Sequence, residues 1–154
     1  MYFLRGVDGI YYWDGRSDPI SPIFSSRNTP VDLDPDRRGR LYIVNDRRLY
    51  VYDRSNGTEL SGLPAHLGVS SVRSPLTKAG VVLAGTTDGL CLSRDYGITW
   101  EEVEVRGLTL AQVFGIYLDP AAPLTAYLAT SRGAFRVSLA ALNPSHKRRR
   151  VSAR

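Results

Sequence analysis

The chain has 154 residues, of which 43% are hydrophobic and 23% are charged, an ordinary composition for about one globular domain. No run of roughly 18 apolar residues exists, so no transmembrane helix is predicted. The N-terminus lacks the basic start and the apolar stretch of a signal peptide, and we therefore expect a cytoplasmic protein by default. The single cysteine, Cys91, excludes a disulfide bond within the chain.

Positive charge is concentrated at the C-terminus. The formal net charge is +5, and five basic residues lie in the last eight positions: Lys147, Arg148, Arg149, Arg150 and Arg154. Without them the chain has 15 basic and 15 acidic residues, so the folded part is not predicted to bind nucleic acid through net charge. We predict that residues 144–154 form a disordered tail, which either only solubilises the protein or contacts nucleic acid or an anionic surface.

The chain contains a repeat of short β-strands. Four strand-like segments follow polar turns, and they cover residues 9–14, 48–53, 89–93 and 133–138. Their starts are 39, 41 and 44 residues apart, and each segment follows another β-rich run. A spacing near 40 residues with several strands in each unit is typical of β-propeller blades. Helices are disfavoured because β-branched and aromatic residues fill the apolar segments, and only residues 139–142 have helical character.

The strands can be assigned as A (innermost) to D (outermost) in four blades. These blades cover about residues 1–25, 26–67, 68–107 and 108–143. The first contains strands B, C and D, the next two contain A to D, and the last contains A, B and C. The two incomplete blades would give six strands rather than four if they were joined, so a neatly closed four-bladed ring is not expected. Three alternatives remain: a ragged ring, part of a longer propeller, or a protomer whose open ends are covered in a homo-oligomer.

Residues 93–100 read SRDYGITW, which is the pattern S-x-D-x-G-x-T-W. The carboxylate of the Asp can accept hydrogen bonds from turn N–H groups, the Gly permits a positive φ, and the Trp can pack under the turn. The pattern resembles the Asp-box, or bacterial neuraminidase repeat, a structural turn of β-propeller blades. The resemblance implies a fastening role between strands C and D for Ser93, Asp95, Gly97, Thr99 and Trp100. Binding of calcium or another ligand is the alternative.

The wider segment 30–138 is similar to the blades of the photosystem II assembly/stability-factor-like and sortilin-like Asp-box families. A degenerate copy of the octet lies at residues 53–60, where Gly57 corresponds to Gly97 and Leu60 corresponds to Trp100. In such propellers the C–D turns lie on one face, and the B–C turns and D–A connections line the other, usual binding face.

The resemblance therefore implies a rim of candidate partner-binding residues with mixed charge. They are Asp46, Arg47, Asp88 and Arg132 from B–C turns, and Arg27, Asn28, His66 and Arg106 from D–A connections. Such a rim suits a partner protein or a glycan. The structural alternative is that Asp and Asn beside Gly are simply favourable residues in hairpin turns.

No catalytic set can be assembled from the sequence. Asp-box propellers include sialidases, but the early Arg-Ile-Pro signature is missing, and the Glu residues fall in or beside predicted outer strands. The histidines are His66 in a loop and His146 in the tail, so neither a His/Cys metal site nor a Ser-His-Asp set is predicted. We predict a non-catalytic binding or scaffold module for a protein partner, without cofactor or metal. A truncated, sialidase-like propeller that binds or hydrolyses glycosides is the alternative.

Overall fold

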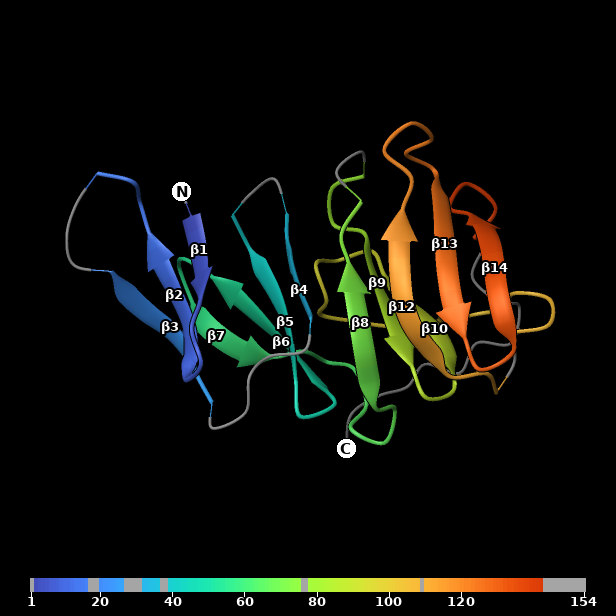
Figure 1. The fold of residues 1–154 in the computed structure, drawn as a ribbon, viewed down its shortest axis with the longest axis horizontal. Helices are drawn as coiled ribbons and strands as arrows, with labels where there is room; N and C mark the ends of the chain where they lie inside the picture. Colours follow the sequence, from blue (N-terminus) through green and yellow to red (C-terminus); the bar gives the residue numbers. More distant parts are fainter. Residues whose placement is uncertain are drawn as a thin grey trace.

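The computed structural model describes residues 2–16, 20–26, 32–36, 39–75, 78–108 and 110–142. In these residues all regular secondary structure is β-strand, and the strands form four antiparallel sheets (Figure 1). This result confirms the predicted all-β array of four short blades. None of the described residues belongs to a helix able to span a membrane. The predicted tail, residues 144–154, lies outside the described residues.

Each sheet is a blade in which every strand pairs with its neighbours along the chain. Blade 1 contains β1 (Tyr2–Arg5), β2 (Gly9–Trp13) and β3 (Ser21–Ser25). Blade 2 contains β4 (Asp32–Pro35), β5 (Leu41–Asn45), β6 (Arg48–Asp53) and β7 (Gly57–Leu60). Blade 3 contains β8 (Val69–Arg73), β9 (Val82–Thr86), β10 (Gly89–Ser93) and β11 (Glu101–Val103). Blade 4 contains β12 (Val113–Leu118), β13 (Thr125–Thr130) and β14 (Gly133–Ser138).

The blades are held together by apolar side chains on both faces of the sheets. Successive side chains of a strand point to opposite faces, so a strand that is apolar throughout can contact two neighbouring sheets. In β9, Val82 and Ala84 pack against blade 2, whereas Leu83 between them packs against blade 4. Cys91 lies on the same face as Ala84, and burial raises the pKa of its thiol to about 12, so the thiol stays protonated as a packing group.

The four blades form an open array. Blade 1 and blade 4 lie at its opposite ends (Figure 1), and the described residues contain no closed sheet. After β14 the chain turns instead of forming the helix that residues 139–142 suggested. The cause is tertiary, because the Leu139 N–H donates to the Leu124 carbonyl (2.7 Å) while Leu139 and Leu142 are buried against blades 3 and 4.

The innermost strands of blades 2 and 3 are joined by carboxylates. Asp32 of β4 accepts hydrogen bonds from the Val72 N–H (2.9 Å) and from the Arg73 guanidinium (2.7 Å). Asp34 accepts one from the Ser74 N–H. Burial raises the pKa of Asp34 to about 6, and the hydrogen bond from Ser74 and the charge of Arg73 only partly oppose this rise.

The raised pKa of Asp34 predicts a specific pH dependence of stability. Between its ordinary value of 3.8 and about 6, the folded state holds a proton that the unfolded state lacks, so the unfolding free energy falls as the pH rises through this window. In Asp34→Asn the neutral amide oxygen can still accept the Ser74 N–H, and this loss disappears. Chemical denaturation should show the variant gaining roughly 1–3 kcal/mol relative to wild type as the pH rises from about 4 to about 7. The exposed carboxylate of Asp88, neutralised as Asp88→Asn, is the control, and a pH-independent difference for Asp34→Asn would contradict the raised pKa.

Candidate functional site

The B–C turns of blades 3 and 4 are built in the same way. The Thr86 hydroxyl donates to the Gly89 carbonyl (2.9 Å) and accepts from the Asp88 N–H (3.2 Å). The Thr130 hydroxyl makes the corresponding bonds to the Gly133 carbonyl (2.7 Å) and from the Arg132 N–H (3.1 Å). Both turns therefore hold an exposed charged side chain at an equivalent position, and the sign of its charge alternates between the blades.

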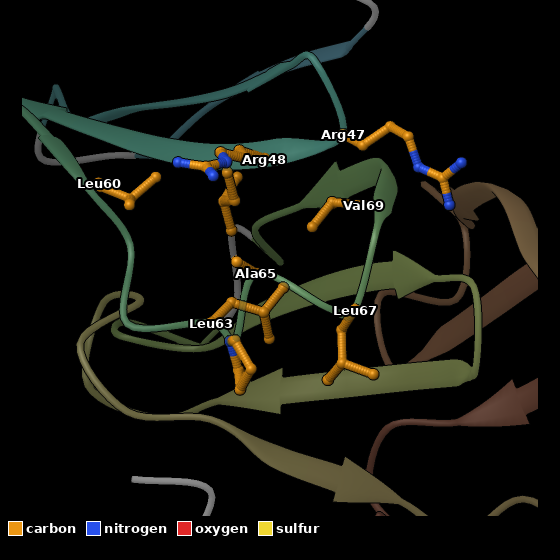
Figure 2. Close-up of a pocket in the computed structure, with 9 residues that line it drawn as sticks. Arg47, Arg48, Leu60, Leu63, Ala65, Leu67 and Val69 are labelled. Carbon is orange, nitrogen blue, oxygen red and sulfur yellow. The ribbon is translucent and has the colours of Figure 1, made fainter. Parts of the chain in front are cut away.

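The B–C turn of blade 2 has a different backbone and also presents charge. Asp46 and Arg47 have φ values of 49° and 61°, the left-handed conformation of a tight hairpin turn. A Cβ atom at Gly68 would lie 2.5 Å from the Nε of Arg47, so a larger residue there would displace this guanidinium from its place over the connection between blades 2 and 3. Figure 2 shows the Arg47 guanidinium directed away from the apolar side chains of Leu63 and Leu67.

Backbone hydrogen bonds join these turns to the neighbouring D–A connections. The Val69 N–H donates to the Arg47 carbonyl (2.8 Å), and the Thr87 N–H donates to the Gly68 carbonyl (2.9 Å). Between blades 3 and 4, the Ser131 N–H donates to the Gln112 carbonyl (2.9 Å). We call these B–C turns and D–A connections the rim. Its segments come from different blades but are fixed relative to one another.

The structure places the described rim candidates at the surface. The exposed ones are Asp46, Arg47, His66, Asp88, Arg106 and Arg132. Arg27 and Asn28 lie outside the described residues. Beside Arg47 the rim is hollowed by only about 10 Å³, a space lined by Leu63, Pro64 and Leu67 among others and large enough for about one water molecule (Figure 2).

The Asp-box forms a dense hydrogen-bonded turn on the face opposite the rim. Asp95 accepts from the Thr99 N–H (2.8 Å), the Thr99 hydroxyl (2.5 Å) and the Ser93 hydroxyl (2.8 Å). Burial alone would raise the pKa of Asp95, but the hydrogen bonds from Thr99 and Ser93 hold it below its ordinary value. Gly97, at a φ of 88°, donates its N–H to the Ser93 oxygen (2.8 Å). These three hydrogen bonds to the Asp95 carboxylate all come from residues of the turn itself.

Trp100 links this turn to blade 2. Its indole N–H donates to the Ser61 hydroxyl (2.8 Å) and to the Gly97 carbonyl (3.0 Å), and only 7% of the residue is exposed. Leu60, which the sequence matched to Trp100, is 52% exposed and lies in β7 opposite Tyr50. That correspondence is wrong because β7 begins at Gly57 directly after its turn, whereas β11 begins only after Trp100.

A groove of about 380 Å³, which the sequence did not indicate, lies beside the Asp-box between blades 2 and 3. It is lined by β7 and by turn residues of both blades, including the exposed Leu60 and Ile98. The Arg40 guanidinium in its wall pairs with Asp53 (2.9 Å) and stacks 4.1 Å from the centre of the Tyr96 ring. Leu60 and Ile98 lie far apart in the sequence, so their proximity follows only from blade packing.

No metal site accompanies either surface in the part of the chain that the structure describes, because no group of three or more His, Cys, Asp or Glu side chains is clustered there.

Comparison with known proteins shows the fold and no family. No protein-family model matches the chain, and no curated protein matches its sequence. Among solved structures it is similar to YCF48 bound to D1 peptide, with a TM-score of 0.62 and 18% identity over 88% of this chain and 45% of that chain. YCF48 from Cyanidioschyzon merolae gives a TM-score of 0.57 at 12% identity, covering 84% of this chain and 44% of that one.

A third similar structure is the extracellular domain of BT4673 from B. thetaiotaomicron, with a TM-score of 0.60 and 15% identity over 88% of this chain and 18% of that chain. The chain thus spans less than half the length of these solved proteins. At such identities the likeness establishes the propeller-type fold alone.

The buried Trp100 gives a direct test of the junction between blades 2 and 3. Trp100→Ala should lower the unfolding free energy by about 3 kcal/mol or more, because it leaves a cavity and removes the indole N–H that donates to Ser61. Leu60→Ala is the matched control, since this half-exposed side chain should change stability by less than about 1 kcal/mol. Equal losses in urea denaturation of the two variants would contradict the assigned packing.

Proposed function

We propose that the chain is a non-catalytic protein-binding module that engages an extended segment of a partner protein through the rim. The observation that carries the proposal is the hydrogen-bonded connection of the rim turns across blades. Because the Arg47, Thr87 and Ser131 backbones are tied to neighbouring segments, the backbone positions that carry the exposed charges are fixed before a partner arrives. A turn whose backbone is already ordered loses little backbone conformational entropy on binding, which favours affinity.

The shape of the rim supports a protein partner over a small ligand. Small-molecule sites are clefts of roughly 300–1,000 Å³. The hollow beside Arg47 holds about one water molecule, so a sugar or a cofactor would find little enclosure there. An extended peptide needs no deep cavity, because backbone groups and alternating charges along a surface can hold it. The alternation of Asp88 and Arg132 in equivalent turns suits a segment that also carries both charges.

The comparisons agree with this proposal. One similar solved structure is YCF48 in complex with a D1 peptide, so a related fold binds a peptide in that protein. Another is described as a gluconolactonase, at 19% identity and a TM-score of 0.55. A lactonase cleaves an ester, so this likeness does not bear on the glycoside-acting alternative, which needs two carboxylates on either side of a substrate cleft. The rim hollow is too small for such a cleft, and in the larger groove beside the Asp-box the Asp53 carboxylate is paired with Arg40 (2.9 Å), so the module is proposed as non-catalytic.

The test uses peptides selected from a random-peptide display library on the immobilised wild-type chain. Their affinities are then measured by fluorescence anisotropy. Reversing charge on the rim in an Arg47→Glu, Arg132→Glu double variant should weaken binding about tenfold or more. The matched control is Arg16→Glu with Lys78→Glu, which reverses the same number of charges in turns on the opposite face. Circular dichroism should be unchanged in both variants.

Two outcomes would refute the proposal. If the library yields no peptide that binds the wild-type chain, the peptide-binding function is wrong. If selected peptides bind the rim variant normally but lose affinity for the control variant, binding occurs on the Asp-box face.

A further inference from the structure

Blades 3 and 4 can be compared residue by residue, because β8, β9 and β10 correspond to β12, β13 and β14 at a constant offset of 44 residues. The register shift at Val69 and Ser71 recurs at Val113 and Gly115. The Thr86–Gly89 turn recurs as Thr130–Gly133. The two blades therefore present equivalent positions on equivalent faces.

The face that blade 3 turns toward blade 4 is fully covered, and the equivalent face of blade 4 is not. Leu83, Leu90 and Leu92 of blade 3 are each 2% exposed or less. Their equivalents in blade 4 are Tyr127, Ala134 and Arg136, all of them exposed, with Tyr127 at 40%. One tyrosine, one alanine and one arginine thus replace the three leucines. This composition is typical of a surface that is hydrated until a partner protein binds to it, rather than of a permanent core.

The uncovered face of blade 4 is aromatic. Tyr117 is 58% exposed and lies opposite Tyr127, with their ring centroids 6.4 Å apart. In blade 3 a Cβ atom at Gly85 would lie 2.8 Å from Val113, so a small residue there lets the next inner strand approach closely. The equivalent residue in blade 4 is Ala129, which already carries a Cβ atom, so a partner strand would lie slightly farther from this face than blade 4 lies from blade 3. We call Tyr117, Tyr127, Ala129, Ala134 and Arg136 the forward end face.

The other end of the array also has an aromatic face that is partly exposed. In blade 1, Phe3 and Ile10 face blade 2. The alternate side chains point the opposite way and pair as Tyr2 with Trp13 and as Leu4 with Tyr11. The Tyr2 and Trp13 rings are 5.4 Å apart, and Tyr2 and Leu4 are exposed. We call these four residues the backward end face.

The two end faces point in opposite directions along the array of blades, so their orientations are complementary. At each junction inside the chain, the forward face of one blade meets the backward face of the next. The forward end face of blade 4 is therefore oriented to pack against a backward face. The backward face that no other blade of this chain contacts belongs to blade 1, at the far end of the array (Figure 1). A second copy of the chain can supply it without any change of fold.

Arginine and aromatic rings already meet across the internal junctions. The Arg54 guanidinium of blade 2 lies 5.6 Å from the centre of the Tyr12 ring of blade 1. Arg40 of blade 2 lies 4.1 Å from that of Tyr96 in blade 3. Such cation–π contacts are attractive and strengthen when water is removed. Arg136 on the forward end face and the Tyr2–Trp13 pair on the backward end face can form a contact of the same kind.

We propose that the forward end face of one chain docks on the backward end face of a second copy, and that two copies join head to tail at both ends to close a ring. Head-to-tail contacts give a ring when their rotation closes and a filament when it does not. A ring of two copies is favoured by length, because one copy spans 45% of a similar solved propeller chain. The proposal does not depend on what the rim binds.

Light scattering on the full 154-residue chain over a wide concentration range tests the proposal. The wild type should have twice the 17.1 kDa mass of one chain at high concentration. Tyr127→Asp on the forward face and Tyr2→Asp on the backward face should each give a monomer, because each variant damages both junctions of the ring. Ile98→Asp is the control, since this exposed apolar residue lies on neither end face, and its mass should stay doubled.

Mixing the two monomeric variants distinguishes the head-to-tail arrangement from a symmetric one. The Tyr127→Asp chain keeps an intact backward face and the Tyr2→Asp chain keeps an intact forward face, so one junction can form and a mixed dimer should appear. Circular dichroism verifies folding, and Arg136→Glu replaces Tyr127→Asp if the latter unfolds. A monomeric wild type, a dimer that survives either end-face variant, or the absence of any mixed dimer would overturn the proposal.

Discussion

The constraint on which this structure depends is that each blade needs a neighbour on both faces. A strand such as β9, in which every residue is buried, has no polar face to present to water. Leu83 is buried against blade 4 and Val82 is buried against blade 2. Loss of either contact would expose an apolar side chain to water, at a cost of roughly 1.5–3 kcal/mol for each side chain. Blades packed in this way form a linear array in which the central members are the most constrained.

Packing of faces leaves the strand edges to be satisfied in another way. The innermost strands are not paired with each other through their backbones, and polar side chains take that role. Asp32 accepts the Val72 N–H of β8, Asp34 accepts the Ser74 N–H just after β8, and the Ser70 hydroxyl donates to the Val113 carbonyl of β12 (2.5 Å). On the rim, backbone hydrogen bonds between adjacent turns also join neighbouring blades. These hydrogen bonds are directional, so they fix the position of one blade relative to the next, whereas apolar packing between faces alone would allow the blades to slide past each other.

The sequence predicted the elements of this fold better than the relations between them. A repeat near 40 residues and β-branched runs separated by turns rich in Gly, Pro, Asp and Asn are local signals, and they predicted the all-β array of four blades. The equation of Leu60 with Trp100 was wrong because a pattern of residue types does not reveal where a strand resumes after its turn. The hydrogen bonds that link the rim involve backbone atoms of Arg47 and Gly68, which carry no side-chain signature at all. The groove beside the Asp-box was missed for the related reason that it exists only between two blades.

The contrast between the two kinds of blade face also says how such an array can be assembled. A junction built from three buried leucines must form as the chain folds, since exposing it would favour aggregation. A face built from Tyr117, Tyr127 and Arg136 can stand in water between encounters, because hydroxyl and guanidinium groups remain hydrated while the rings and the methylene stem supply contact area. Replacing leucine with tyrosine, alanine and arginine at the end of the array therefore lowers the cost of leaving that face open. The interior junctions fix the shape of the array, and the proposed docking between end faces can follow folding.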